Sequence, residues 1–201
     1  MSGIIAQNSG RHTGLVKASS GGGGVWNLIE TLTADGSGTT LDFTSGIDST
    51  YDEYVFKFIN IHPQTDEANF QVNFRDGSTA YDATKTTTTF EARHNEDDSV
   101  AALYYDTGAD LAQGTGIQLL MSYQGGDNDQ SVSGYMQLFA PSDTTFVKHF
   151  IARTSAINGD DRQRDNYIAG YCNVTAAIDG VQFSMSTGNM DSGTISLYGI
   201  S

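Results

Sequence analysis

The spacing most suggestive of chemistry is an acidic loop in which oxygen-bearing side chains alternate. Asp127, Asp129 and Ser131 occupy alternate positions, and alternate side chains of a tight loop can direct their oxygens at one calcium ion. The pattern departs from the helical calcium-binding loop at its sixth and twelfth positions, which are Val132 and Leu138 instead of Gly and Glu. Asp127 and Asp129 therefore remain calcium candidates only with help from other loops, and the alternative is a solvated turn. The acidic residues that could help are Glu96, Asp97, Asp98, Asp160 and Asp161.

The other groups that could act in catalysis show no spacing typical of an active site. No two of the four histidines are four residues apart, and the sequence lacks a serine nucleophile elbow, a phosphate-binding glycine loop and the HExxH zinc motif. Two of the 24 acidic residues could form a pair of catalytic carboxylates as in a glycosidase, but the sequence does not indicate which two. Cys172 lies in an apolar stretch typical of a strand, where a thiol is buried and inert. We therefore expect a non-enzymatic protein without a catalytic residue, cofactor or resident metal. The histidines are His12, His62, His94 and His149.

Tyrosines near polar loops offer a second kind of site. Tyr81, Tyr104, Tyr105 and Tyr123 lie beside stretches rich in Asp, Asn and Gly. Sugar-binding β-sandwiches combine exposed aromatic rings with such loops, so a host glycan is one expected ligand. The alternative is that each ring packs at a strand edge and leaves its hydroxyl in water.

The elements that must position these side chains are β-strands. From Val25 onward apolar residues recur with a period of two, and turn residues such as those at 125–128 interrupt them about every ten residues. In the stretch 70–75, Phe70, Val72 and Phe74 share one face. The stretch 54–61 is apolar on both faces and is closed by Pro63, which predicts a central strand. The predicted strands are 26–33, 41–43, 54–61, 70–75, 86–93, 103–106, 117–123, 131–139, 145–154, 166–174, 180–185 and 194–198.

This pattern predicts an all-β protein: one antiparallel β-sandwich of jelly-roll type over residues 25–201, preceded by an extended N-terminal arm. No segment shows a helical apolar spacing over a dozen residues; 45–53 could form at most one helical turn. The predicted core residues are Trp26, Leu28, Phe43, Phe56, Phe58, Ile59, Phe70, Val72, Phe74, Leu119, Met136, Leu138, Phe150, Ile168, Phe183 and Leu197.

Residues 1–24 differ in composition from the rest. They contain two basic residues and no Asp or Glu, and they end in the four glycines 21–24, which form a flexible joint. Two apolar pairs within them are too short to build a core alone. We predict an attachment arm that binds a partner outside its own sandwich, and the alternative is a disordered tail. The predicted partner-binding residues are Ile4, Ile5, Arg11, Leu15, Val16 and Lys17.

The negative net charge and the lack of a long apolar run limit the kinds of partner that we expect this protein to bind. Ten basic and 24 acidic residues give a net charge of −14, which repels a phosphate backbone, so we expect no nucleic-acid ligand. One cysteine cannot form an intrachain disulfide or hold a zinc site alone. No apolar run approaches the roughly 18 residues that span a bilayer, and the start lacks the features of a secretion signal. We expect a protein that is made and kept soluble, with no membrane partner.

Five stretches together resemble one protein family. They are MSGIIAQN at 1–8, GLVKA at 14–18, LDFTSGIDSTYDEY at 41–54, FVKH at 146–149 and GNMDSGTISLYGI at 188–200. The chain is similar in them, and over most of its length, to small virion structural proteins of marine tailed bacteriophages, including cyanophages.

The resemblance implies a non-enzymatic part of the virion. The leading expectation is an exterior head decoration or cement protein, or a head-attached appendage, anchored by the arm to the major capsid protein or another virion protein. The alternative is a tail-associated fibre-like protein or adhesin that binds a host surface glycan. The resemblance also implies a homotrimer on the particle exterior, assembled in the host cytoplasm.

Overall fold

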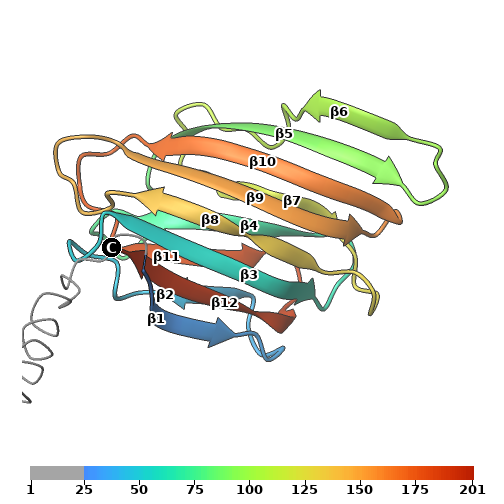
Figure 1. The fold of residues 1–201 in the computed structure, drawn as a ribbon, viewed down its shortest axis with the longest axis horizontal. Helices are drawn as coiled ribbons and strands as arrows, with labels where there is room; N and C mark the ends of the chain where they lie inside the picture. The colour runs from blue at the N-terminus through green and yellow to red at the C-terminus, as the bar shows by residue number, and fades with distance from the viewer. Residues whose placement is uncertain (1–24) are drawn as a thin grey trace, which may run out of the picture.

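A computed structural model describes residues 25–201, which form a sandwich of two antiparallel β-sheets (Figure 1). The predicted all-β, two-sheet fold is therefore confirmed. Within this range none of the secondary structure is a helix of the length and hydrophobicity needed to cross a membrane. The strands are β1 (Trp26–Thr33), β2 (Thr40–Phe43), β3 (Glu53–Pro63), β4 (Ala68–Arg75), β5 (Lys85–Asn95), β6 (Ala101–Tyr105), β7 (Gln118–Gln124), β8 (Val132–Phe139), β9 (Lys148–Asn158), β10 (Arg162–Cys172), β11 (Gly180–Met185) and β12 (Met190–Ile200).

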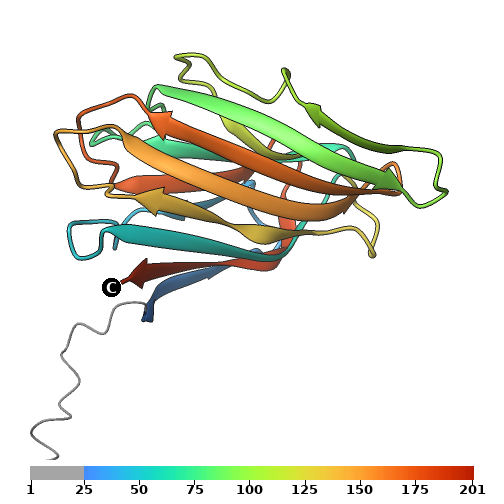
Figure 2. The same ribbon diagram turned by 45° about the horizontal axis from the view of Figure 1, so that its top comes forward.

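The two sheets differ in size. The large sheet has eight strands in the order β1-β12-β3-β8-β9-β10-β5-β6, and the small sheet has four in the order β2-β11-β4-β7. The large sheet runs as one broad twisted layer from β1, in blue, to β6, in green (Figure 2). The jelly-roll type remains a prediction, because that architecture is built from two Greek keys of eight strands in all.

Every predicted strand exists, and the differences lie at the ends. Strand β10 begins at Arg162, four residues before the predicted start, and β12 begins at Met190 instead of Thr194. The first residues of β10 are polar, so apolar alternation did not predict them as part of the strand. Pairing with β5 on one side and β9 on the other keeps these residues in the sheet. Strand β9 begins three residues late, because the backbone amides of Thr145 and Phe146 instead donate to the Asp143 carboxylate in a turn.

The core lies between the sheets and centres on phenylalanine. Phe183 of the small sheet lies 5.3 Å from Phe56 and 5.1 Å from Phe58 of the large sheet, measured between ring centroids. Phe43 and Phe70 complete this cluster with centroids 6.1 and 5.9 Å from that of Phe183. All five rings are buried, which confirms these five members of the predicted core.

Four predicted core residues were wrong. Trp26, Leu28 and Ile59 are exposed at 47%, 60% and 53%, and Leu119 is half-buried while its neighbour Leu120 takes the core position. Trp26 and Leu28 lie on the outer face of the large sheet, which the small sheet does not cover. Trp26 packs there against Tyr198, with ring centroids 5.4 Å apart. Ile59 directly follows the buried Phe58, so strand alternation turns its side chain outward, and the register shift after Phe58 brings Ile61 into the core instead.

Candidate functional site

The predicted arm residues cannot be placed. Ile4, Ile5, Arg11, Leu15, Val16 and Lys17 lie outside the described residues. The described chain begins at Val25, next to edge strand β1, where Trp26 pairs with Ile200. Both ends of the domain therefore meet at one corner of the large sheet (Figure 1).

The calcium candidates do not gather ligands. Asp127 and Asp129 are both exposed. The backbone oxygen of Asp127 lies 3.1 Å from Nε2 of His62 and accepts from the Gln130 amide at 2.9 Å. Their proposed helpers instead gather elsewhere, in a pocket that Glu96, Asp97, Asp160 and Asp161 line together with Asn95. Across residues 25–201, no group of three or more His, Cys, Asp or Glu side chains is arranged to hold a metal ion.

The four loop tyrosines do not form one site. Tyr104 and Tyr123 line the same pocket. Tyr81 lies far along the fold beside Arg75, whose guanidinium carbon is 5.8 Å from the centroid of the ring. Tyr105 stands on the outer face of β6 and donates to Asp110 at 2.6 Å. Sequence reasoning therefore found two members of a pocket and missed its arginines.

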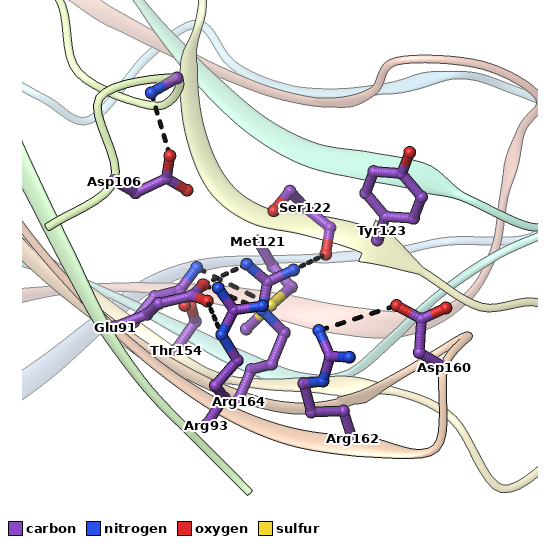
Figure 3. A network of polar contacts seen from close by, with 12 residues as sticks. Glu91, Arg93, Asp106, Met121, Ser122, Tyr123, Thr154, Asp160, Arg162 and Arg164 are labelled. Carbon is purple, nitrogen blue, oxygen red and sulfur yellow. Dashed lines mark hydrogen bonds and ion pairs between the residues drawn. The ribbon is translucent and has the colours of Figure 1, made fainter. Parts of the chain in front are cut away.

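That pocket, hereafter the arginine pocket, lies where β5, β6, β7 and β10 come together (Figure 3). Its volume is about 260 Å³. It forms because β5 and β10 pair antiparallel and both turn charged residues toward the interior at this end, with Arg93 directly opposite Arg164. Its lining residues are Arg93, Tyr104, Asp106, Ser122, Tyr123, Asp160, Arg162 and Arg164.

The floor of the arginine pocket is a buried ion pair. The side chains of Arg164 and Glu91 are only 6% and 1% exposed. Nε and Nη2 of Arg164 both donate to Oε2 of Glu91, the first at 3.0 Å, while Nη1 donates to the Ser122 carbonyl oxygen at 2.8 Å. Because each nitrogen of the guanidinium has an acceptor, Arg164 is a structural cation that fixes the floor.

Arg93 shares the same carboxylate. Its Nε lies 3.2 Å from Oε1 of Glu91, and its guanidinium carbon lies 3.9 Å from the centroid of the Tyr104 ring. Two guanidinium groups directly opposite on neighbouring strands would repel each other, and Glu91 between them offsets that repulsion. Burial, together with the nearby Glu91 carboxylate, raises the pKa of Tyr104 to about 12. Its hydroxyl is therefore neutral at physiological pH.

Arg162 and Tyr123 form the rim. Nε of Arg162 donates to Oδ1 of Asn95 at 2.6 Å, and its Nη1 is 3.9 Å from the carboxylate of Asp160, whose side chain is 55% exposed. Tyr123 has a φ of 58°, a left-handed conformation that a tyrosine rarely adopts. Two hydrogen bonds hold it there: its amide donates to Oδ1 of Asn69, and its carbonyl accepts from the Gly159 amide.

A second surface lies on the outer face of the large sheet. Phe90, Tyr167, Arg153 and Tyr135 occupy successive register positions across β5, β10, β9 and β8. Phe90 stacks on Tyr167 with ring centroids 4.8 Å apart, and the Arg153 guanidinium carbon lies 4.8 Å from the same ring while its nitrogens donate to Asp165. The residues form the wall of an apolar hollow of about 220 Å³ that Ile151 also lines.

Two lysines are buried at the opposite end of the core. Lys85 and Lys148 are both register partners of Cys172, one on each side of β10, and all three are fully buried. Lys85 donates to the carbonyl oxygens of Ala83 and Gly116 at 2.9 and 2.8 Å. Burial lowers the pKa of Lys85 to about 8 and raises that of Cys172 to about 12. The thiol is thus buried, as predicted, in surroundings that disfavour its reactive thiolate form, and the two lysines link loops to the sheet.

Comparisons with known proteins add little. No protein-family model matches the chain, and no curated protein matches it. Among solved structures, one of the Gt strain of infectious bursal disease virus aligns at 8% identity with a TM-score of 0.16, over 85% of this chain and 42% of that one. The structure of the Gx strain aligns at 11% identity with a TM-score of 0.14, over 89% of this chain and 39% of that one.

The chain thus spans less than half the length of these viral proteins. TM-scores this low do not establish a shared fold. The class that the structure itself defines is a two-sheet β-sandwich with an arginine pocket and an aromatic outer face, and any function must be argued from those features and from the sequence.

Proposed function

We propose that this chain is a non-enzymatic structural protein of a tailed-bacteriophage particle, attached by residues 1–24 to the exterior of the head or to a head-attached appendage. The observation that carries the proposal is the abrupt change at Val25. A rigid edge strand begins there, directly after four glycines and a segment that holds apolar pairs but no acidic residue. A segment joined in this way can bind a neighbour without disturbing the sandwich.

The position of the junction suits such a role. Both ends of the described domain lie at one corner of the large sheet, so attachment there leaves the opposite edge and the outer face of the sheet exposed. An extended stretch of 24 residues reaches about 80 Å, at roughly 3.3 Å per residue. A partner subunit or the capsid surface lies within that range.

The expected partners are other virion proteins, the major capsid protein above all, and two further copies of this chain in a homotrimer. Subtracting the two basic charges of residues 1–24 from the net −14 leaves −16 on residues 25–201. Neighbouring copies repel through that charge over only about 8 Å in physiological salt, so dense packing on a particle is tolerated. Light scattering of the purified chain measures its oligomeric state, and a monomer would contradict the trimer.

Deletion of residues 1–20 tests the attachment. The truncated chain should keep the β-rich circular dichroism spectrum of the full chain and fail to enter particles. Normal occupancy of the truncated chain on purified virions would refute the anchoring role.

Paired substitutions test what the arm binds with. Replacing Ile4 and Ile5 by Ser should lower occupancy more than replacing Arg11 and Lys17 by Gln. The reason is that a buried Ile contributes roughly 1.5 to 3 kcal/mol whereas an exposed ion pair contributes up to about 1 kcal/mol. Occupancy should for the same reason survive washing at high salt. Release in 1 M NaCl, or greater damage from the charge substitutions, would show that attachment is electrostatic.

The arginine pocket favours a second candidate function, a tail-associated adhesin that binds a host surface glycan. Its two tyrosines, its serine and its arginines are the side chains that recognise sugars and their charged substituents. The copy number in purified virions separates the two functions. Decoration of the head requires hundreds of copies, whereas a tail appendage requires tens or fewer.

A further inference from the structure

We propose that the arginine pocket binds a singly charged oxyanion carried by a sugar, as in a uronic acid. The proposal deepens the adhesin function, but it concerns the purified chain alone and does not depend on whether residues 1–24 attach to a particle. Three of the five described arginines converge there in a chain whose net charge is −14, and four observations define the ligand.

The first observation is the charge balance of the floor. Glu91 is one carboxylate between two guanidinium groups, those of Arg164 and Arg93. Nε and Nη2 of Arg164 both donate to one oxygen of Glu91 while Arg93 lies beside the other, so two guanidinium groups share one carboxylate here. Asp106 and Asp160 also line the pocket and balance the charge of its three arginines as a whole, but Oδ1 of Asp106 accepts from the Gly108 amide at 3.0 Å within its own loop. On the rim, Arg162 faces Asp160 at 3.9 Å in a half-exposed setting, where solvent screens the pair. The excess of one positive charge is confined to the surroundings of Glu91, and a local excess of this size suits a monoanion better than a dianion.

The second observation is that donors remain available. Within the described part of the chain, the terminal nitrogens of Arg93 make no hydrogen bond, and those of Arg162 make none beyond the long contact with Asp160. The guanidinium carbon of Arg93 lies over the Tyr104 ring, 3.9 Å from its centroid, and this contact restricts the orientation of the guanidinium group. A fixed planar fork is the geometry that binds a carboxylate through two parallel hydrogen bonds.

The third observation is the strained residue on the rim. Tyr123 keeps a left-handed backbone, with φ of 58°, although that conformation costs free energy in a tyrosine. Tyr123 lines the pocket and is half-exposed, and in Figure 3 its ring extends from the strand that also carries Ser122, away from the guanidinium groups and toward solvent. Strain of this kind persists where the surrounding structure enforces it, and it is frequent at ligand sites. An exposed tyrosine ring at the rim of a pocket is a surface on which a sugar ring can pack.

The fourth observation is the size and polarity of the space. At about 260 Å³ it is smaller than the ~300 to 1,000 Å³ of pockets for drug-sized ligands. The pocket therefore takes one sugar residue or the charged end of a chain. The outer-face hollow beside Phe90 and Tyr167 has no free cation facing a comparable polar wall, since Arg153 is bound to Asp165 by two hydrogen bonds.

The test is calorimetric titration of the full chain with D-glucuronate, D-glucose and inorganic sulfate. Glucuronate should bind with a dissociation constant in the millimolar range, up to about 10 mM, and glucose should bind at least tenfold more weakly, about 1.4 kcal/mol in free energy. Arg162→Gln should weaken glucuronate binding by about tenfold, because it removes a charged donor. Arg153→Gln, on the outer face of the same sheet, is the matched control and should leave binding unchanged.

Tyr123→Gly keeps the test decisive if Arg162→Gln unfolds the protein. Glycine accepts the left-handed φ without strain, so this variant should melt at or above the wild-type temperature and yet bind glucuronate more weakly. Three results would overturn the proposal: no detectable binding of glucuronate, equal binding of glucose, or glucuronate binding that Arg162→Gln and Tyr123→Gly leave intact. Sulfate binding as tight as that of glucuronate would overturn the sugar specificity and leave a simple anion site.

Discussion

Replacing Lys85 by Met should change how the stability of this protein depends on pH. Lys85 is fully buried, its amine contacts two carbonyl oxygens, and burial lowers its pKa from 10.5 to about 8. Because the folded pKa lies below the unfolded one, the unfolded chain binds more protons between pH 8 and 10.5. The contribution of Lys85 to the free energy of unfolding therefore rises with pH through that window.

The magnitude follows from the size of the shift. One pKa unit corresponds to about 1.36 kcal/mol, so the charged form of Lys85 costs the folded state about 3 kcal/mol at pH 7. Titration between pH 7 and pH 9.5 recovers roughly 2 kcal/mol of that cost. Methionine carries no such cost at any pH but loses both hydrogen bonds to the carbonyl oxygens. The stability of the variant relative to the wild type should consequently fall by about 2 kcal/mol between pH 7 and pH 9.5.

The assay is urea unfolding followed by circular dichroism at several pH values from 7 to 9.5. Cys172 opposes the effect, because its pKa is raised to about 12 and the free thiolate favours the unfolded state above pH 9. The comparison is therefore best made in a Cys172→Ala background, which removes that titration from both proteins. Lys57→Met, at an exposed lysine, controls for the loss of a charged side chain. A stability difference between Lys85→Met and its parent that stays constant with pH would refute the reasoning.

Three further substitutions or reactions probe the described structure. Glu91→Gln should destabilise the protein by about 3 to 5 kcal/mol in urea unfolding, because it leaves the buried cation of Arg164 uncompensated; a loss below about 1 kcal/mol would show that Arg164 is solvated. Phe183→Ala should cost about 3 to 5 kcal/mol, because four phenylalanine rings pack around that side chain. A smaller effect than that of the half-buried Leu119→Ala would contradict the placement of the core. Cys172 should not react with a thiol reagent at pH 8 until denaturant is added, and rapid reaction of the native protein would show that the end of β10 opens.

The sequence by itself predicted the two-sheet β-sandwich because the pattern that marks a strand is local. Alternation with a period of two and the turn residues between runs depend only on neighbours along the chain, so every strand could be found, including the central strand that ends at Pro63. The same local pattern predicted the burial of Cys172. Strand ends were less predictable where the strand is polar, as at Arg162, because there the sheet neighbours rather than the residue pattern maintain the strand.

The arginine pocket shows what only the tertiary structure decided. Glu91 and Arg93, and likewise Arg162 and Arg164, alternate along their strands, and that spacing could have marked them as sharing one face. What the sequence does not contain is that β5 and β10, separated by more than sixty residues, become neighbours and bring Arg93 opposite Arg164. The order of strands in a sheet depends on the combined packing of all strands. Charged residues such as Glu91 and Arg164, which the sequence alone would place on the surface, are therefore buried beside each other. The exposure of Trp26 also depends on tertiary structure, because no second layer covers the outer face of the large sheet on which it lies.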